Sequence, residues 1–199
     1  MSYLKKIRMP YTIIDTGFWH EIMIPRIDSG RLDHRALYST FFFVDEGSAP
    51  CATTYLADVG RYVARIIADA KTLNRMVFAY GEVTTQRAVV DMVERLSGEE
   101  CPFKAVRSEQ VAAAIRSGEL DLWPQVILEY VYSTWARGDN DPQWAEFMGY
   151  LDAKSLYPDL EVHTMERSIS DALAHPGTNP GFGKEQMCAQ ISQALEKVE

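Results

Sequence analysis

The first place to look for chemistry in this chain is the end of a predicted strand. Residues 11–16 read Tyr-Thr-Ile-Ile-Asp-Thr, and these β-branched side chains, closed by Gly17, predict a buried strand. His20 and Glu21 follow this strand directly. In open α/β sheets ligands bind outside the carboxyl ends of the strands, and histidine exchanges a proton near neutral pH. We therefore consider His20 a candidate for chemistry or substrate contact, with a structural or pocket-wall role as the alternative.

The other three histidines do not have the spacing of a metal site. His34, His163 and His175 are remote from His20 and from one another in the sequence. Two histidines four residues apart would lie on one side of a helix and hold a metal, and the chain has no such pair. We therefore expect no metal ion, and we expect His163 to be a packed or edge residue of a strand.

Aromatic side chains also follow the strand over 11–16. Phe18 and Trp19 come directly after Gly17, and aromatic walls at a strand end suit a flat apolar ligand. We expect Phe18, Trp19 and Met23 to line a pocket, together with Trp135 from a later apolar helix. The alternative for each of these side chains is an ordinary place in the core.

Two other patterns resemble cofactor motifs and have simpler explanations. Tyr150 and Lys154 have the Tyr-x-x-x-Lys spacing that can place two polar groups on one helix face for acid catalysis. They lie in an irregular segment beside Pro158, so we interpret the pair as a coincidence. Residues 177–184 are rich in glycine, but their spacing differs from a phosphate-binding loop and no strand precedes them. We interpret this stretch as a linker into a helix.

Composition and charge exclude several classes of protein. The 199 residues are 47% hydrophobic and 24% charged, as in a globular protein of one domain. The net charge of −8 disfavours nucleic acid or an anionic membrane as the main partner, because both require a basic face. We find no apolar run of membrane-spanning length and no signal peptide. Cys51, Cys101 and Cys188 fit neither a zinc site nor a disulfide framework, so we expect a reduced, cytoplasmic protein.

Strand and helix patterns alternate along the chain, which predicts the α/β class. The strands are too few and too short to form a doubly wound sheet alone. We expect residues 53–56 to pair with 41–44, Thr84 to cap a helix, and residues 138–160 to be irregular. The expected strands are 11–16, 41–44, 53–56, 75–80, 103–106 and 161–164. We expect residues 3–8 to be the end of a helix. About six further helices are expected, at 58–67, 84–97, 108–118, 120–137, 166–174 and 184–198.

Five blocks of sequence, in order, resemble the NmrA-like and isoflavone reductase family. Residues 9–21 (MPYTIIDTGFWHE) are similar to the family's "iPYT…GFFxEN" stretch, and residues 56–60 (LADVG) to its "DIG" helix start. Residues 69–75 (DAKTLNR) are similar to "DPRTLNK", and residues 131–139 (VYSTWARGD) to "FVKGD". Residues 156–166 (LYPDLEVHTME) are similar to "LYPDvkYtTvdE". The blocks cover about residues 9–173 and are closest to the branch of isoflavone reductases and phenylcoumaran benzylic ether reductases.

This resemblance implies a partial Rossmann-type fold, mainly the carboxyl-terminal substrate-binding half, over residues 1–175. Residues 176–199 are then a linker and a terminal helix. It implies NADPH as cofactor and hydride transfer to a small aromatic or phenolic molecule, in secondary metabolism, by a cytoplasmic monomer or homodimer. It also implies Thr16, Gly17 and Phe18 as cofactor-binding residues and Trp19, His20, Met23 and Trp135 as substrate-binding residues.

The family's glycine-rich loop and catalytic lysine belong before the block at residues 9–21, so the resemblance assigns no catalytic residue here. Gly17 stands where isoflavone reductases usually carry a polar residue. Three hypotheses remain open. In the first, the chain is part of a reductase whose cofactor-binding half is missing. In the second, it is a non-enzymatic regulatory or dinucleotide-sensing module. In the third, it is an inactive truncated paralogue. In the last case, exposed apolar surface predicts dimerisation or aggregation.

Overall fold

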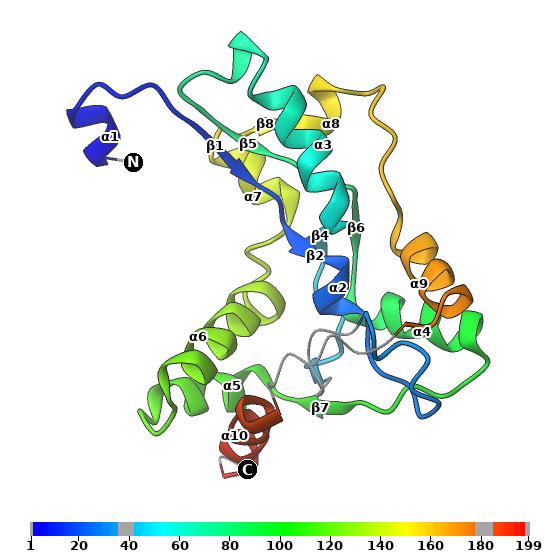
Figure 1. Cartoon of the computed structure of the whole chain (residues 1–199). Helices are drawn as coiled ribbons and strands as arrows, with labels where there is room; N and C mark the ends of the chain where they lie inside the picture. The colour runs from blue at the N-terminus through cyan, green and yellow to red at the C-terminus, as the bar shows by residue number, and fades with distance from the viewer. Residues whose placement is uncertain (1, 36–41, 178–184, 198–199) are drawn as a thin grey trace.

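Eight short strands and ten α-helices lie in residues 2–35, 42–177 and 185–197, which the computed structural model describes (Figure 1). This confirms the α/β class, with more helices than the sequence predicted. The strands are β1 (Thr12–Asp15), β2 (Phe18–Trp19), β3 (Phe42–Val44), β4 (Cys51–Thr54), β5 (Arg75–Phe78), β6 (Glu82–Thr84), β7 (Lys104–Val106) and β8 (Leu151–Asp152). The α-helices are α1 (Ser2–Lys6), α2 (His20–Met23), α3 (Leu56–Ile66), α4 (Gln86–Ser97), α5 (Ser108–Arg116), α6 (Leu122–Val131), α7 (Pro142–Phe147), α8 (Ala153–Leu156), α9 (Met165–Ala174) and α10 (Glu185–Glu196). A 3-10 turn, η1 (Ala70–Thr72), precedes β5, and a π-helix, η2 (Tyr132–Ala136), continues α6.

The first sheet is parallel, in the order β1-β5-β8. Successive side chains of a strand point to opposite faces. Val77 of β5 packs in a cluster with Tyr62 and Ile66 of α3, while its neighbour Phe78 packs with Ala145 of α7. Helices therefore cover both faces of this small sheet. Because the strands are parallel, the carboxyl ends of β1 and β5 lie side by side, with Asp15 opposite Phe78.

A second sheet has the order β2-β4-β6 and begins directly after β1. Gly17 makes this change of sheet possible, because its φ is +64°, a conformation that other residues adopt only with strain. A Cβ at this position would lie 2.6 Å from the carbonyl oxygen of Ala52 in β4. The chain therefore turns tightly over β4 and then pairs with it in parallel, with Phe18 opposite Thr53.

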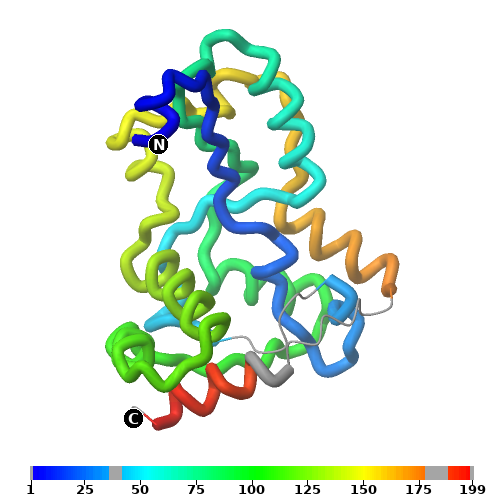
Figure 2. The backbone as a smooth tube through the Cα atoms, turned by 60° about the vertical axis from the view of Figure 1, so that its left-hand side comes forward, coloured from blue at the N-terminus to red at the C-terminus, as the bar shows by residue number. Residues whose placement is uncertain are grey.

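The largest cluster of buried side chains lies below these sheets, where α5, α6, η2 and α10 gather around the third sheet, β3-β7 (Figure 2). Figure 2 shows α10, in red, beside the green helices α5 and α6. Ile191 and Leu195 of α10 are buried in this cluster, as are Leu128 of α6 and Trp135 of η2. The terminal helix thus contributes to the main core.

Several predicted elements are wrong. Residues 51–54 pair with β2 and β6 and not with residues 41–44, whose strand β3 pairs with β7. The predicted strand over 161–164 is absent from the described chain, because the backbone N–H of His163 donates to the carboxylate of Asp58 (2.6 Å) rather than to a neighbouring strand.

Two further expectations differ in detail. Residues 138–160 are not irregular as a whole, because α7, β8 and α8 lie within them. Asp141 accepts a hydrogen bond from the N–H of Gln143 and begins α7, with Pro142 at its first position. The cap of α4 is Thr85, and Thr84 ends β6.

The predicted linker lies largely outside the described residues, since its positions 178–184 are not described.

Candidate functional site

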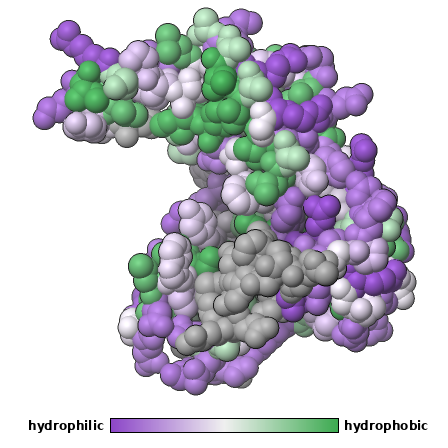
Figure 3. All heavy atoms as spheres, in the orientation of Figure 1, coloured by the Kyte–Doolittle hydropathy of each residue, from purple (hydrophilic) through white to green (hydrophobic). Residues whose placement is uncertain are grey.

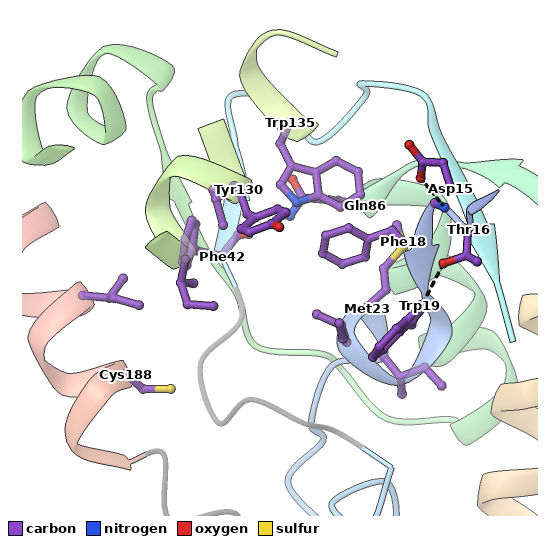
Figure 4. Close-up of a pocket in the computed structure, with 16 residues that line it drawn as sticks. Asp15, Thr16, Phe18, Trp19, Met23, Phe42, Gln86, Tyr130, Trp135 and Cys188 are labelled. Carbon is purple, nitrogen blue, oxygen red and sulfur yellow. Dashed lines mark hydrogen bonds between the residues drawn. The ribbon is translucent and has the colours of Figure 1, made fainter. Parts of the chain in front are cut away.

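A cavity of about 470 Å³ opens at the carboxyl end of β1 (Figure 4). This volume lies in the range of sites for small molecules. Its lining joins segments that are far apart in the sequence, from the β1–α2 region, β3, the start of α4, α6 with η2, and α10. The lining residues are Asp15, Thr16, Gly17, Phe18, Trp19, Ile22, Met23, Ile24, Phe42, Gln86, Ile127, Tyr130, Val131, Trp135, Cys188 and Ile191.

Hydrogen bonds fix the backbone at one end of the cavity. The N–H of Gly17 donates to Asp15 Oδ1 (3.2 Å), and Thr16 Oγ1 accepts from the indole N–H of Trp19 (3.2 Å). The buried hydroxyl of Thr54 lies 2.6 Å from the carbonyl oxygen of Thr16 and 3.2 Å from that of Ala79. Thr54 therefore joins the ends of β1 and β5 beneath the cavity, and this end is its polar end.

The aromatic part of the lining comes from β2, from β3 and from α6 with η2. The ring of Phe18 meets the indole of Trp135 edge-on, with 5.4 Å between their centroids. Trp135 lies in the π-helix, where the N–H of Arg137 donates to the carbonyl of Tyr132 five residues back (3.0 Å). Single π turns often occur at functional sites, because they change which side chains a helix presents. Figure 4 shows Trp135, Phe18 and Met23 together, with Cys188 across the space from them.

The wall opposite β1 contains residues that sequence reasoning missed. Gln86 at the start of α4 accepts from the N–H of Val44 (3.1 Å) and donates to the carbonyl of Phe42 (2.9 Å), so its amide holds β3 in place. Ile127, Tyr130 and Val131 recur at helical spacing, as do Cys188 and Ile191. This spacing marks one face of a helix. Nothing local in the sequence shows which cavity that face meets.

The residues expected at the site separate into two groups in the structure. Thr16, Gly17 and Phe18, expected at the cofactor, and Trp19, Met23 and Trp135, expected at the substrate, all line the cavity. His20 does not line it. Its imidazole is fully buried and lies 2.7 Å, through Nδ1, from the hydroxyl oxygen of Ser168 in α9. Burial lowers the pKa of His20 to about 4, so the ring is neutral near pH 7.

The Tyr-x-x-x-Lys pair does not reach the cavity. The ammonium group of Lys154 donates to the carbonyl oxygen of Gly81 (3.0 Å) and lies over the ring of Tyr80. Tyr150 packs beside Phe78 and Ala145. These contacts hold α8 and α7 against the sheet, so both residues have structural roles.

The charges around the cavity decide which part of a dinucleotide it fits. Asp15 is the charged residue of the lining, and no lysine or arginine is among the described residues that form it. A pyrophosphate requires basic side chains or a glycine-rich turn at a helix N-terminus, and the described residues of the lining provide neither. The described lining therefore does not provide the groups that bind the phosphates of a dinucleotide.

Metal-binding clusters and membrane-spanning helices are absent from the described residues. No group of three or more His, Cys, Asp or Glu side chains is placed to hold a metal ion. Cys51, Cys101 and Cys188 are free and buried, and burial raises the pKa of the Cys51 thiol to about 12 and that of Cys101 to about 11. In the same part of the chain, no helix has the length and apolar character needed to cross a membrane.

Comparison with curated proteins gives relatives of one kind, although no protein-family model matches the chain. Asnovolin J 5′,6′-dehydrogenase from Aspergillus novofumigatus is 34% identical over 185 residues, which cover 87% of this chain and 57% of that protein. Phenylcoumaran benzylic ether reductase Betv6 from Betula pendula is 24% identical over 163 residues, covering 81% of this chain and 52% of that protein. The chain thus spans little more than half the length of these relatives.

Solved structures show the same fold. Leucoanthocyanidin reductase from Vitis vinifera, in a binary complex with NADPH, has a TM-score of 0.71 at 16% identity, over 87% of this chain and 58% of that one. A structure described as AtPrR2 with NADP+ and (+)pinoresinol has a TM-score of 0.66 at 17% identity, over 86% of this chain and 54% of that one.

Parallel strands with a ligand-sized cavity at their carboxyl end define a Rossmann-type α/β protein. The relatives and structural neighbours are isoflavone reductase-like proteins, and they match most of the chain. Over most of its length the chain is therefore similar to isoflavone reductase-like proteins, which confirms the resemblance predicted from the five sequence blocks.

Proposed function

We propose that this chain is the substrate-binding part of an NADPH-dependent reductase that acts on a small aromatic or phenolic molecule. The observation that carries the proposal is the cavity at the end of β1, which is mostly apolar and is lined by five aromatic residues, Phe18, Trp19, Phe42, Tyr130 and Trp135. Rings at offset or edge-on angles suit another flat ring. Among the related proteins, one solved structure contains both NADP+ and (+)pinoresinol.

The two ends of the cavity have different parts in this proposal. Thr16, Gly17 and Phe18 contact the nicotinamide, because they lie at the carboxyl end of β1. Trp19, Met23 and Trp135 hold the aromatic substrate, and Cys188 and Ile191 of α10 limit its length. The region of residues 1–175 forms most of the site, and the terminal helix within 176–199 closes one side. His20 does not contact the bound molecule, and it affects the site by fixing the position of α2.

The phosphates of the cofactor require groups that the described residues of the cavity do not provide. The sequence contains no Gly-x-Gly-x-x-Gly turn, and no basic side chain is among the described residues of the lining. We propose that a further cofactor-binding part of the protein supplies these contacts. The described part of the chain leaves a place for it, because β1 pairs with β5 alone and Figure 3 shows apolar surface on the near face around β1.

The test is a titration of the 199-residue chain with (+)-pinoresinol and, separately, with NADPH, followed by tryptophan fluorescence. We expect micromolar binding of pinoresinol and much weaker binding of NADPH, with no oxidation of NADPH when both are present. The variant Trp135→Phe should lose most of the fluorescence change, and the matched variant Trp123→Phe should keep it, because Trp123 is 68% exposed and outside the cavity. Failure of pinoresinol and of smaller phenols to bind would contradict the proposal.

A non-enzymatic dinucleotide sensor is the second candidate. It is favoured by the lining itself, because its described residues include no lysine or histidine that could exchange a proton with a bound molecule. The same titration separates the two candidates, since tight binding of NADPH to this chain alone, without turnover, supports the sensor. If neither class of molecule binds, the chain is an inactive paralogue.

The proposal extends to a role in secondary metabolism, a cytoplasmic location and a homodimer. The free, buried cysteines support a reducing compartment. The exposed apolar side chains of α7 support self-association.

A further inference from the structure

The imidazole of His20 is buried between α2 and α9 with one of its two nitrogens unused. Its Nδ1 pairs with Ser168 Oγ at 2.7 Å. Its Nε2 is inaccessible to solvent and has no hydrogen-bond partner among the described residues. Buried polar groups in folded proteins almost always have a partner, so this nitrogen requires an explanation.

Two more polar atoms in the same place lack a hydrogen-bond partner. Glu21 Oε2 and His163 Nε2 are both inaccessible to solvent and unpaired by hydrogen bonds within the described chain. His163 Nε2 lies 3.4 Å from a carboxylate oxygen of Asp171, beyond the usual length of a hydrogen bond. Together with His20, these residues line one small cavity of about 10 Å³, separate from the large cavity at β1. Its other lining residues are Ile24, Arg35, Tyr55, Ser168 and Asp171.

The side chains cannot easily turn to satisfy one another. The ring of His163 stacks on Tyr55, with 4.3 Å between centroids and 25° between planes, and its backbone N–H donates to Asp58. The ring of His20 is held by Ser168 and packs near Tyr55 as well, at 6.2 Å. The three polar atoms are therefore fixed on the wall of the small cavity.

A cavity of this volume is the size of one water molecule, and a buried water requires two to four polar partners. We propose that His20 Nε2, Glu21 Oε2 and His163 Nε2 bind one buried water molecule, which joins α2 to the segment before α9. The water donates to the carboxylate of Glu21 and to one imidazole, and it accepts from the other. Neutral imidazoles supply one donor and one acceptor each, so every polar atom obtains a partner.

Water fits the site better than an ion. The charged and titratable groups that face His20 are Glu21 on its own helix, Arg35 from the following loop, Asp58 of α3, His163, and Asp171 of α9. The three groups named in the proposal do not form a recognised metal arrangement in the described chain. Burial lowers the pKa of His20 to about 4, which leaves its ring neutral.

The water site also bears on the large cavity. The residues of α2 that follow Glu21 are Ile22 and Met23, and both line the large cavity. Helix α2 is one turn long, and its end is marked by the N–H of Ile24 donating to the carbonyl of His20 (3.0 Å). Such a short helix is not stable by itself. A water held between α2 and the segment before α9 fixes the position of Met23 without touching any ligand.

The site is tested by a high-resolution crystal structure of the 199-residue chain and by NMR. We expect one water within about 3.2 Å of all three atoms, and a nuclear Overhauser effect between this water and the His20 ring. The variant His163→Phe keeps the stack on Tyr55 and removes one partner. It should lose the ordered water and speed amide exchange at Ile24 by roughly tenfold, since a buried group is then left unpaired. The control His175→Phe, at an exposed histidine, should change neither.

Direct hydrogen bonds from Glu21 to either histidine, with no water between them, would overturn the proposal. An ion of any kind at this position would do the same. If His163→Phe does not fold, Glu21→Leu and the conservative Glu21→Gln replace it, and only the leucine variant should lose the water. None of these measurements depends on the ligand of the large cavity, so the two proposals can fail separately.

Discussion

The indole of Trp135 meets the ring of Phe18 edge-on, at 5.4 Å between centroids and 63° between planes, although 117 positions separate them in the chain. This pair joins the π-helix after α6 to the start of β2. Edge-on pairs contribute about 0.5–1.5 kcal/mol beyond the burial of their area. The contact therefore fixes the spacing between two walls of the large cavity.

Replacing Trp135 with alanine should destabilise the fold and the ligand site together. The side chain is 6% exposed, and removal of a buried tryptophan costs about 3–5 kcal/mol. Urea unfolding measures the loss of free energy, and titration with (+)-pinoresinol measures the site. Trp144→Ala is the matched control, because Trp144 is 53% exposed and should cost much less. Equal losses for both variants would show that Trp135 is not a core residue.

The variant Gly17→Ala should be strongly destabilised, for two independent reasons. The residue has φ +64°, and its new Cβ would lie 2.6 Å from the backbone oxygen of Ala52. Together the strain and the clash should cost at least about 2 kcal/mol. Gly60→Ala is the control, since its Cβ meets nothing within 4 Å in the middle of α3. That variant should gain up to about 1 kcal/mol, and thermal unfolding compares the two.

Removing the hydroxyl of Thr54 should loosen the ends of β1 and β5. Thr54→Val keeps the shape and leaves the carbonyl oxygen of Thr16 without this donor, at a cost of about 1–3 kcal/mol. Thr54→Ser keeps the hydroxyl and should recover most of that loss. Amide exchange at Ala79, whose N–H donates to Asp15, should rise in the valine variant alone. The same exchange rate in both variants would mean that the hydroxyl does not hold the strands.

His20 should make stability depend on pH between about 6.5 and 4. The pKa of His20 is lowered from 6.5 to about 4, first by burial and then by His163. The unfolded chain therefore binds this proton at higher pH than the folded chain, so stability is full above pH 6.5 and falls as the pH drops towards 4. A shift of this size corresponds to about 3 kcal/mol. Urea midpoints across this range measure the slope, and His20→Asn should flatten it.

Glu21 produces the opposite slope in part of the same range. Burial raises its pKa above 4.5, so the folded chain keeps this proton longer, and stability falls as the pH rises through the raised pKa. The effect of His20 is therefore best measured in a Glu21→Gln background. His175→Asn serves as the control for a change of histidine at an exposed position. A slope that persists in the His20→Asn, Glu21→Gln double variant would assign it to other groups.

The exposed face of α7 should drive self-association. Trp144, Phe147 and Met148 are 53%, 83% and 63% exposed, and the first two rings contact each other. Contiguous apolar side chains of this kind mark interaction surfaces. Sedimentation of the 199-residue chain should show a dimer or larger species, and Phe147→Glu should shift it towards the monomer. Ile67→Glu, at an exposed position on another element, should not. A monodisperse monomer at the start would contradict the prediction.

Local patterns predicted the elements whose signals are strong. The run of β-branched residues before Gly17 gave β1, and the spacing of Tyr62 and Ile66 gave α3. Pairing between strands was not predictable, because it depends on which distant segment lies alongside. Residues 51–54 therefore received the wrong partner.

The same distinction between local patterns and long-range contacts applies to the residues of the large cavity. Residues adjacent to the strand end, such as Thr16 and Trp19, were named from the sequence because chain neighbours stay together. Gln86, Tyr130 and Cys188 were not, since each reaches the cavity through packing between elements. The position of His20 was also beyond the sequence. Its ring turns away from the cavity because Ser168, 148 residues later, offers a partner inside the core.

That long contact has a consequence for synthesis. Helix α2 leaves the ribosome long before α9, and at about 5–20 residues per second the 148 residues between His20 and Ser168 take roughly 7–30 s to be made. During this interval His20 lacks Ser168, its native partner in α9. The wall of the ligand cavity is thus among the last parts of the protein to acquire its shape, and a nascent chain stalled before α9 would present an incomplete cavity to chaperones.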